Sequence, residues 1–463
     1  MNDFIRKNVW LFVSLILFST LFLPFITTLP LRDGNIDFVQ SYYFFQGGYD
    51  KFFLHFNSAH PPLKVFTLSM LYQIFGVHPE FPALLGYILG FGGIIGGFIT
   101  SKKLSNTKTA SLFVTLLSIN PLFISSGIFS LTDYILTNLI LISLALFLNN
   151  KLFLYTLSLI AIVLTKETGI LFVIILLAVD IIYSQKRIRT LMPYIAAFAA
   201  YGLWQYFLHS LGKSSWKDYL FTSTADRGTF YTVFHNIITL QIINGYAHQQ
   251  LLQLLFLNSN WIMIGSSIIL TFVFFSNKVD RTKFINQLIA PNQKSKAIIT
   301  IALFCFLYFI SVLSLQTFTI PRYALPIIPF LILWFSVSIQ KLKTIIIERI
   351  LVTIVFSVSL ISLFISPDPF ASSLWGKTDL LGQNIYSMAN TISGNDGVVY
   401  NLQFIKGGKL RTKIIKGYAT NHDAAPWRLC KDLFPDPKND LITMRVSGLG
   451  SAAHCLTSPN VNW

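Results

Sequence analysis

Long apolar runs separated by short polar gaps make up most of the chain. About 20 apolar residues in a helix cross the ~30 Å hydrocarbon core of a bilayer. This length predicts an all-α polytopic membrane protein with about eleven transmembrane helices. The predicted spans are residues 9–31, 81–100, 109–128, 133–149, 152–166, 169–185, 190–210, 252–275, 297–315, 323–340 and 346–366.

The first apolar run follows Arg6 and Lys7 and extends to about Leu31. A signal peptide has a shorter apolar core and a small-residue cleavage site. We therefore expect this run to be an uncleaved first transmembrane helix.

Residues 61–77 are apolar but short, and they open with Pro61-Pro62 and close with Gly76-Val77. We expect a helix that lies at the outer interface. With the N-terminus inside, this choice places 17 Lys and Arg residues in inner loops and 8 in outer loops before the tail, as the positive-inside rule requires. Counting 61–77 as a span would reverse the bias. The inner set is Arg6, Lys7, Lys102, Lys103, Lys108, Lys151, Lys186, Arg187, Arg189, Lys278, Arg281, Lys283, Lys294, Lys296, Lys341, Lys343 and Arg349, and the outer set is Arg32, Lys51, Lys64, Lys166, Lys213, Lys217, Arg227 and Arg322.

From about Pro367 the composition changes to Gly, Asn, Asp and Lys, with turn signals such as Asn395-Asp396-Gly397. Segments 398–402 and 413–415 predict short strands. We expect a transmembrane domain over residues 1–366 and an extracytoplasmic C-terminal domain over residues 367–463. Within the latter, residues 375–463 are expected to form a small soluble α+β appendage.

The composition supports a lipid environment. The chain is 53% hydrophobic and 12% charged, with a mean hydropathy of +0.61, and a soluble fold could not cover that much apolar surface. The net charge of +16 would suggest nucleic acid in a soluble protein. Here the basic residues lie between apolar runs, so we expect no nucleic-acid partner.

The three cysteines divide into two kinds. Cys305 lies in an apolar run and is expected to pack there. Cys430 and Cys455 lie in the polar tail, where they could form a disulfide in an oxidising compartment or remain free thiols.

Ionisable residues gather at the predicted outer boundary of the membrane. They are costly near lipid and tend to be functional or paired. They come from five separate stretches of the chain: Asp33, Asp37, His60, Lys64, Asp133, Lys166, Glu167 and Arg322.

Asp33 and Asp37 lie in the first outer loop, where a carboxylate can act as a general base or as a metal ligand near a phosphate. Asp37 could instead cap a helix that begins at Phe38. His60 precedes Pro61-Pro62, which fix the backbone and can aim the imidazole. A lone loop histidine is more often an ordinary surface residue.

Asp133 follows Ser130-Leu131-Thr132 at the start of a span. Thr132 or Asp133 could cap the helix, or Asp133 could face the first-loop carboxylates. Lys166-Glu167 interrupt an apolar stretch. Lys166 at the membrane edge suits a lipid phosphate, and the alternative is an inert solvated pair of Lys166 and Glu167. Arg322 can grip phosphate with its planar fork of donors, or extend to the interface. Tyr323, which follows it, is a further site candidate, as are His60 and Glu167.

These residues could support sugar transfer from a polyprenyl phosphate. Lys166 and Arg322 would stabilise the departing phosphate, and Asp37 or Asp33 would accept the proton of the acceptor hydroxyl. Asp133 would orient the acceptor or, with Asp37, hold a divalent metal. The residues leave open whether any metal or other cofactor is needed.

Over residues 9–335 the chain resembles the multi-spanning type-C glycosyltransferases, in particular the branch of the dolichyl-phosphate-mannose protein mannosyltransferases and the aminoarabinose lipid A transferases. The resemblance rests on an ordered set of segments. These are Asp33 to Asp37, His60-Pro61-Pro62-Leu63, Ile74-Phe75-Gly76, Asn120-Pro121 with Asp133, Lys166-Glu167-Thr168-Gly169, and Arg322-Tyr323-Ala324-Leu325-Pro326.

The resemblance implies an inverting hexosyl- or pentosyltransferase at the extracytoplasmic face of the plasma membrane. It implies a polyprenyl-phosphate sugar as donor, a glycan, lipid or protein as acceptor, and Asp37 or Asp33 as the base. Family members often have Asp-Glu at this place, whereas here Phe38 follows Asp37 and Gly34 follows Asp33.

Two other functional interpretations of the sequence pattern remain. A lipid or sugar transporter or flippase would carry polar groups near the midplane and often repeated halves, whereas here the ionisable groups lie at one edge and no halves match. A non-catalytic scaffold would present the outer tail to a partner.

Overall fold

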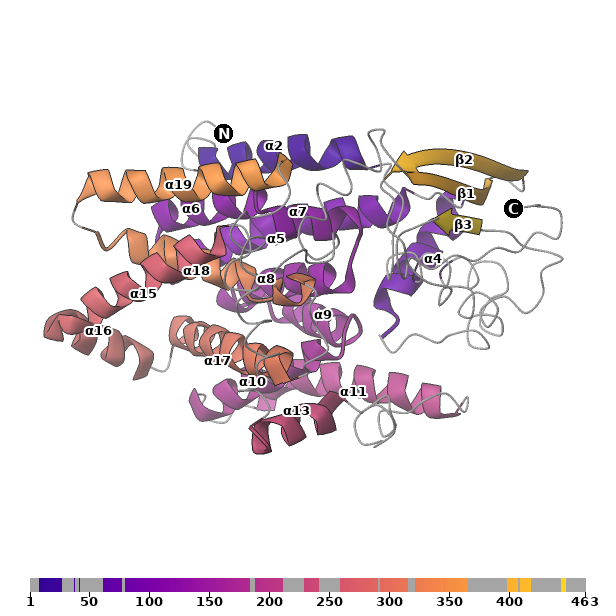
Figure 1. The fold of residues 1–463 in the computed structure, drawn as a ribbon. Coiled ribbons are helices and arrows are strands. Elements are labelled where there is room, and N and C mark those ends of the chain that lie inside the picture. Colours follow the sequence, from indigo (N-terminus) through magenta and orange to yellow (C-terminus); the bar gives the residue numbers. More distant parts are fainter. Residues whose placement is uncertain are drawn as a thin grey trace.

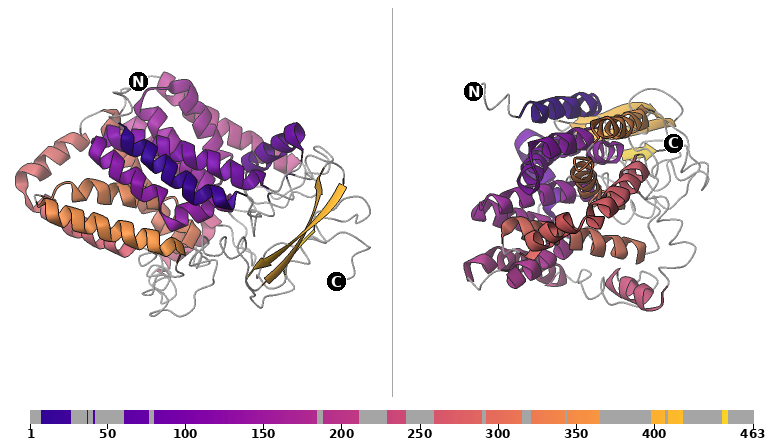
Figure 2. Two further views of the ribbon diagram at one scale, coloured as in Figure 1. Left: turned by 90° about the horizontal axis from the view of Figure 1, so that it is seen from above. Right: turned by 90° about the vertical axis from the view of Figure 1, so that its left-hand side faces the viewer.

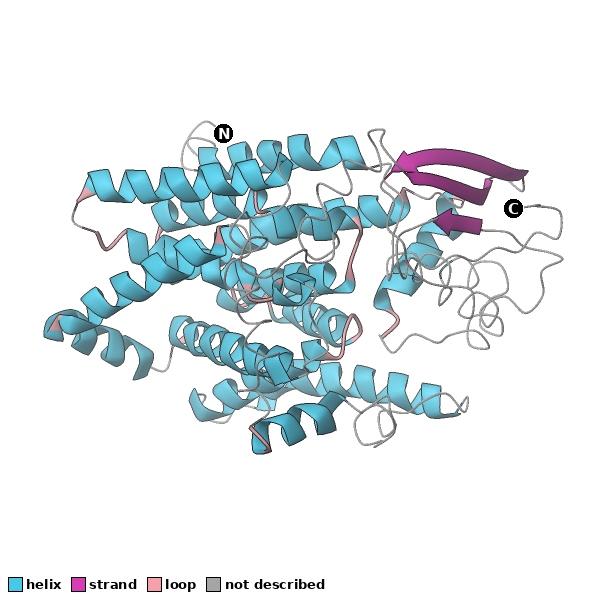
Figure 3. Cartoon of the chain, viewed as in Figure 1, coloured by secondary structure: helices cyan, strands magenta, loops and turns pink. Residues whose placement is uncertain are grey.

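The computed structural model is a bundle of helices with a small sheet near its C-terminus (Figures 1 and 3). Described in it are residues 8–26, 37, 41, 61–76, 80–183, 188–210, 229–240, 259–289, 292–314, 321–342, 344–364, 398–406, 409–417 and 443–446. Asp33 and His60 lie outside this set, as do Cys430 and Cys455.

Each of the eleven predicted apolar runs contains a helix. The helices that match them are α2 (Val9–Phe22), α5 (Phe81–Leu104), α6 (Thr107–Ser118) with α7 (Pro121–Ile128), α8 (Thr132–Leu148), α9 (Leu152–Val163), α10 (Thr168–Tyr183), α11 (Ile188–Ser210), α15 (Asn260–Ser276), α17 (Gln293–Ser314), α18 (Ile328–Ile339) and α19 (Ile345–Phe364). The short run after Pro61-Pro62 forms α4 (Leu63–Phe75), so the predicted helix is confirmed, whereas its position at the interface stays a prediction.

Among the described residues, length and composition alone qualify three helices as membrane spans: α5, α17 and residues 345–363 of α19. The pair α6 and α7 qualifies when it is taken as one bent span, and the other apolar helices named above are shorter or less apolar. A polytopic helical architecture is therefore supported, and the count of eleven spans stays a prediction.

The span predicted over residues 109–128 is bent rather than continuous, because α6 and α7 meet at an angle of 55°. Asn120 causes the break: its side chain accepts a hydrogen bond from Phe123 N at 3.0 Å and caps a new helix that starts with Pro121. Proline has no N–H to continue the preceding helix.

The run predicted over residues 323–340 also begins differently. It opens with a short 3-10 helix, η3 (Pro321–Ala324), and α18 starts only at Ile328. Pro326 between them cannot donate a helical hydrogen bond. Two further helices, α13 (Thr229–Ile238) and α16 (Lys278–Ile289), were not expected.

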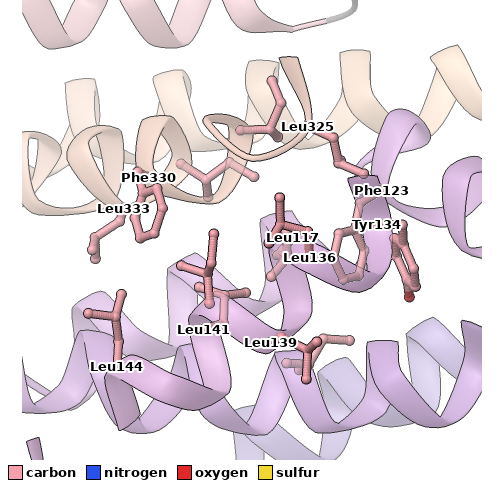
Figure 4. Packing of buried hydrophobic residues seen from close by; sticks show 14 of the residues in the cluster. Leu117, Phe123, Tyr134, Leu136, Leu139, Leu141, Leu144, Leu325, Phe330 and Leu333 are labelled. Carbon is pink, nitrogen blue, oxygen red and sulfur yellow. The ribbon is translucent and has the colours of Figure 1, made fainter. Parts of the chain in front are cut away.

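Helix α8 lies in the middle of the bundle and is buried along most of its length. Figure 4 shows its leucines, among them Leu136, Leu139, Leu141 and Leu144, in one apolar cluster with side chains of the neighbouring helices. Leu325, which directly follows η3, is fully buried in the same cluster. The core therefore holds η3 against the helices that carry the other ionisable residues.

Glycines allow α5 to approach its neighbours closely. A Cβ atom at Gly86 would lie 2.1 Å from the backbone oxygen of Gly127 in α7, and one at Gly96 would lie 2.9 Å from Cα of Ile142 in α8. Small residues at such positions let helix backbones pack at short range in lipid, where apolar burial gives little drive for association.

The C-terminal strands form an antiparallel sheet of order β2-β1-β3. Strands β1 (Val398–Lys406), β2 (Lys409–Gly417) and β3 (Thr443–Val446) include both segments predicted as strands. The sheet lies beyond the end of the bundle where α4 also lies, as both Figure 1 and Figure 2 show. Its assignment to a separate soluble appendage stays a prediction.

The contact of α5 with α7 predicts a steric effect of one methyl group. Gly86→Ala should lower the free energy of unfolding by about 1–3 kcal/mol, because backbone cannot move aside as a flexible side chain can. Gly202→Ala in α11 is the control, since nothing lies within 4 Å of that Cβ position. Thermal unfolding in detergent checks both, and equal melting temperatures for the two variants would contradict the packing.

Candidate active site

Asp133 is held by the tight turn between α7 and α8. Within this turn Ser130 has a φ of +49°, and Leu131 N donates to Ser126 O at 2.9 Å. Leu131 is the N-cap of α8 and makes no side-chain cap, so the expectation that Thr132 or Asp133 caps the helix is wrong. Asp133 instead lies in the first turn, where the helix dipole favours a carboxylate.

Lys166 lies in the turn between α9 and α10, and its side chain is buried. Gly169 permits this turn, because a Cβ there would lie 2.5 Å from the backbone oxygen of Ile162. Lys166 O accepts a hydrogen bond from Gly169 N at 2.9 Å. The alternative of a solvated, inert Lys166-Glu167 pair is wrong for the lysine, while Glu167 lies half-buried beside it.

Asp133 and Lys166 form a buried ion pair. Lys166 Nζ donates to Asp133 Oδ1 at 2.5 Å, and Arg322 Nε lies 4.0 Å from Asp133 Oδ2. Asp133 is 1% exposed, Lys166 5% and Arg322 9%. Arg322 therefore does not extend to an aqueous interface, and two cationic groups flank one carboxylate.

Tyr323 joins this cluster through its ring. Lys166 Nζ lies 4.8 Å from the ring centroid, and the Arg322 guanidinium carbon lies 5.1 Å from it. Arg322 Nη2 also donates to the Tyr323 hydroxyl at 3.1 Å. A ring face attracts desolvated cations, so Tyr323 fixes the positions of both.

A second buried ion pair joins Asp37 to α4. Lys64 Nζ donates to Asp37 Oδ2 at 2.7 Å, and both residues are buried. Burial raises the pKa of the Tyr72 hydroxyl in α4 well above its ordinary value, and the negative charge of Asp37 raises it further. Tyr72 therefore stays protonated at neutral pH, within the field of Asp37.

The two ion pairs belong to the same end of the bundle. Leu63 N, next to Lys64, donates to the backbone oxygen of Leu164, two residues before Lys166, at 2.9 Å. The structure thus brings together Asp37, Lys64, Asp133, Lys166, Arg322 and Tyr323 from separate segments. Of the other predicted site residues, Asp33 and His60 lie outside the described residues.

A metal site is not apparent among the residues that the structure describes. They contain no group of three or more His, Cys, Asp or Glu side chains that could hold an ion. Asp37 and Asp133, the two expected metal ligands, each accept a hydrogen bond from a lysine ammonium. A divalent cation would have to displace that ammonium.

A third buried ion pair was missed by the sequence reasoning. Asp180 in α10 accepts hydrogen bonds from Lys296 Nζ at 2.6 Å and from the Tyr194 hydroxyl at 3.0 Å. A lone acid in an apolar run was the available signal. Asp180 is 12 residues along α10 from Thr168, about 18 Å from the site end, so it belongs to the opposite end of the bundle.

The site and the bundle define an integral membrane protein with buried cationic residues at one end. No protein-family model matches the chain, and no curated protein matches its sequence. Solved structures do match its fold.

One similar structure is ArnT from Cupriavidus metallidurans bound to undecaprenyl phosphate. It is 15% identical, with a TM-score of 0.53 over 83% of this chain and 68% of the other. The apo structure of ArnT from the same organism is 14% identical, with a TM-score of 0.53 over 85% and 69% of the two chains. At this identity the likeness concerns the fold alone. The chain therefore shares the fold of these two ArnT structures, which agrees with the fold that the resemblance implied.

The buried cluster predicts strong energetic coupling between Asp133 and Lys166. Lys166→Met should lower the free energy of unfolding by about 3–5 kcal/mol, because it leaves a carboxylate in the interior with a weaker partner. Asp133→Asn in the same chain should restore part of the loss. A double-mutant cycle from unfolding in detergent measures this coupling.

The matched control is Lys108→Met, which breaks the 2.6 Å pair of Lys108 with Glu348. The Lys108 side chain is 64% exposed, so we expect a loss below about 1 kcal/mol. Additive effects of the Asp133 and Lys166 changes would show that the two side chains do not interact.

Proposed function

We propose that this protein is a membrane glycosyltransferase that moves a sugar from a polyprenyl-phosphate donor to an acceptor at the extracytoplasmic face of the plasma membrane. The observation that carries the proposal is the convergence of Lys166, Arg322 and Tyr323 on one buried position at the end of the bundle. The fold shared with ArnT is consistent with it.

The cationic pair supports the donor side of the proposal. A phosphate next to the membrane is recognised by charge-assisted hydrogen bonds, and a guanidinium supplies two in a planar fork. Lys166 comes from the α9–α10 turn and Arg322 from η3, which the buried Leu325 anchors. Both cations are thus held in place before the donor arrives, as electrostatic stabilisation of a leaving group requires.

The acceptor side is assigned to Asp37. Its carboxylate accepts the proton of the acceptor hydroxyl while that oxygen attacks the anomeric carbon. The bond between the anomeric carbon and the phosphate oxygen breaks, and its electron pair leaves with the polyprenyl phosphate, which Lys166 and Arg322 stabilise. The hydrogen bond from Lys64 to Asp37 orients the base. Asp33 is the alternative base, and His60 and Glu167 are further candidates for contacts to sugar or acceptor.

Asp133 is assigned to the donor side by its contacts with Lys166 and Arg322. An acceptor-orienting role remains compatible with its position. If the reaction uses a divalent metal, the carboxylates of Asp37 and Asp133 are the proposed ligands, because such a cation prefers oxygen ligands.

The charge distribution and α4 support the proposed orientation. The basic loop residues favour an N-terminus in the cytoplasm, about eleven spans and an extracytoplasmic tail. Met70, Ile74 and Phe75 of α4 are exposed apolar side chains, as expected of a helix lying in the outer interface. This arrangement places the ion pairs at the outer rim. The sugar is a hexose or a pentose, and the acceptor is a glycan, lipid or protein.

The base assignment predicts a selective loss. Asp37→Asn should reduce glycosyl transfer by about 10²–10⁴-fold, the usual contribution of a general base, and leave binding of undecaprenyl phosphate within about twofold. Transfer is measured with the purified full chain in liposomes and radiolabelled polyprenyl-phosphate sugars. Arg322→Ala should instead weaken donor binding and transfer together.

Asp33→Asn is the comparison for the choice of base, because whichever variant retains transfer is not the base. Full activity in the Asp33, Asp37 and Arg322 variants alike would remove the proposed site. Movement of the labelled lipid or sugar across the bilayer without any glycosyl product would favour the transporter instead.

A further inference from the structure

The position proposed for the donor phosphate already holds an anion of the chain itself. Asp133 Oδ1 accepts from Lys166 Nζ at 2.5 Å, and Oδ2 faces Arg322 Nε at 4.0 Å. These are the same two cations that the proposed function assigns to the donor. A phosphate oxygen and the Asp133 carboxylate therefore compete for the same donors.

We propose that the Asp133 carboxylate is a built-in placeholder for the donor phosphate, which the phosphate must displace from Lys166 and Arg322. This inference rests on the proposed function and adds a control on how the site binds and releases its lipid. In this proposal Asp133 acts neither as the general base nor as a metal ligand.

Burial explains why a placeholder is needed. Lys166 and Arg322 are at least nine-tenths buried, and an uncompensated charge in the interior costs several kcal/mol. Without the Asp133 carboxylate, the buried Lys166 ammonium would lose this anion whenever the donor left. Asp133 supplies that charge from the first turn of α8, so the empty site remains stable.

The charges also fit an exchange. Asp133, Lys166 and Arg322 together carry one negative and two positive charges. A polyprenyl-phosphate sugar is a phosphodiester with a single negative charge, so it can replace the Asp133 carboxylate at Lys166 charge for charge. After transfer the phosphate becomes a monoester, which carries about −1.5 to −2 at neutral pH. Asp133 then repels it more strongly, which offsets part of its stronger attraction to Lys166 and Arg322. Product release is therefore faster than from a site without this carboxylate.

The geometry of α8 limits this motion to the side chain. The backbone of Asp133 belongs to a helix that is buried along its length, and Asp133 O accepts from Thr137 Oγ1 at 2.7 Å. A change of side-chain rotamer is therefore the available way to free Lys166.

The test measures binding of undecaprenyl phosphate to the full-length protein in phosphatidylcholine nanodiscs. Asp133→Asn removes the competing charge and should lower the dissociation constant at least tenfold. Undecaprenyl phosphate should also raise the melting temperature of this variant more than that of the wild-type protein. In steady-state transfer, Asp133→Asn should show stronger inhibition by undecaprenyl phosphate.

Control variants separate the effect of the Asp133 charge from a general loosening of the protein structure. Asp180→Asn makes the same substitution in the Asp–Lys pair at the opposite end of the bundle, with Lys296 at 2.6 Å, and should leave the dissociation constant unchanged. Adding Lys166→Met to Asp133→Asn should abolish the gain. Undecaprenol and phosphatidylglycerol replace the probe in parallel, and tight binding of the latter would identify a general lipid-headgroup site and overturn the assignment to the donor.

The outcomes distinguish the inference from the proposed function. Wild-type binding with an unchanged or weaker dissociation constant for Asp133→Asn overturns the placeholder and leaves the transferase standing. No binding of undecaprenyl phosphate by the wild-type protein overturns both. If Asp133→Asn does not fold, a structure of the wild-type protein with undecaprenyl phosphate decides: a phosphate on Lys166 with Asp133 turned away supports the placeholder, and an intact Asp133–Lys166 pair overturns it.

Discussion

The buried ion pair between Asp133 and Lys166 is the constraint on which the proposed site depends. Charges taken out of water must be paired, because the interior returns little of the solvation energy that they lose. The pair fixes the start of α8 against the α9–α10 turn and, through Arg322 and Tyr323, fixes η3 as well. The contacts of Asp133 thus join segments that lie almost 190 residues apart in the sequence, at residues 133 and 322.

The helical core makes this arrangement possible. Glycines on α5 bring α7 and α8 close, Asn120 and Pro121 bend the chain so that the α7–α8 turn reaches the site, and Leu325 holds η3 in the apolar cluster. Each of these features is local in the sequence, yet together they decide where the side chains of Asp133, Lys166, Arg322 and Tyr323 meet. The ionisable side chains thus gather at one end of the bundle, and apolar packing fills its body.

The sequence reasoning predicted the helices well because their signal is length and hydropathy, both of which are local. It predicted Asp133, Lys166, Arg322 and Tyr323 as site residues from their place at the ends of apolar runs. It missed the break at Asn120, since an Asn-Pro pair in an apolar stretch permits either a continuous or a bent helix. It also missed the Asp180 network, because the partner Lys296 lies 116 residues away.

The sequence alone therefore determined that the chain lies in lipid and that its fold is helical. The signals were apolar runs of membrane length, basic gaps between them and a polar tail. Periodicity and composition carry that information because each helix satisfies its own backbone hydrogen bonds. Only the tertiary structure decided which charges pair. An ion pair requires side chains within about 4 Å, and that proximity arises from the packing of helices that no single segment encodes.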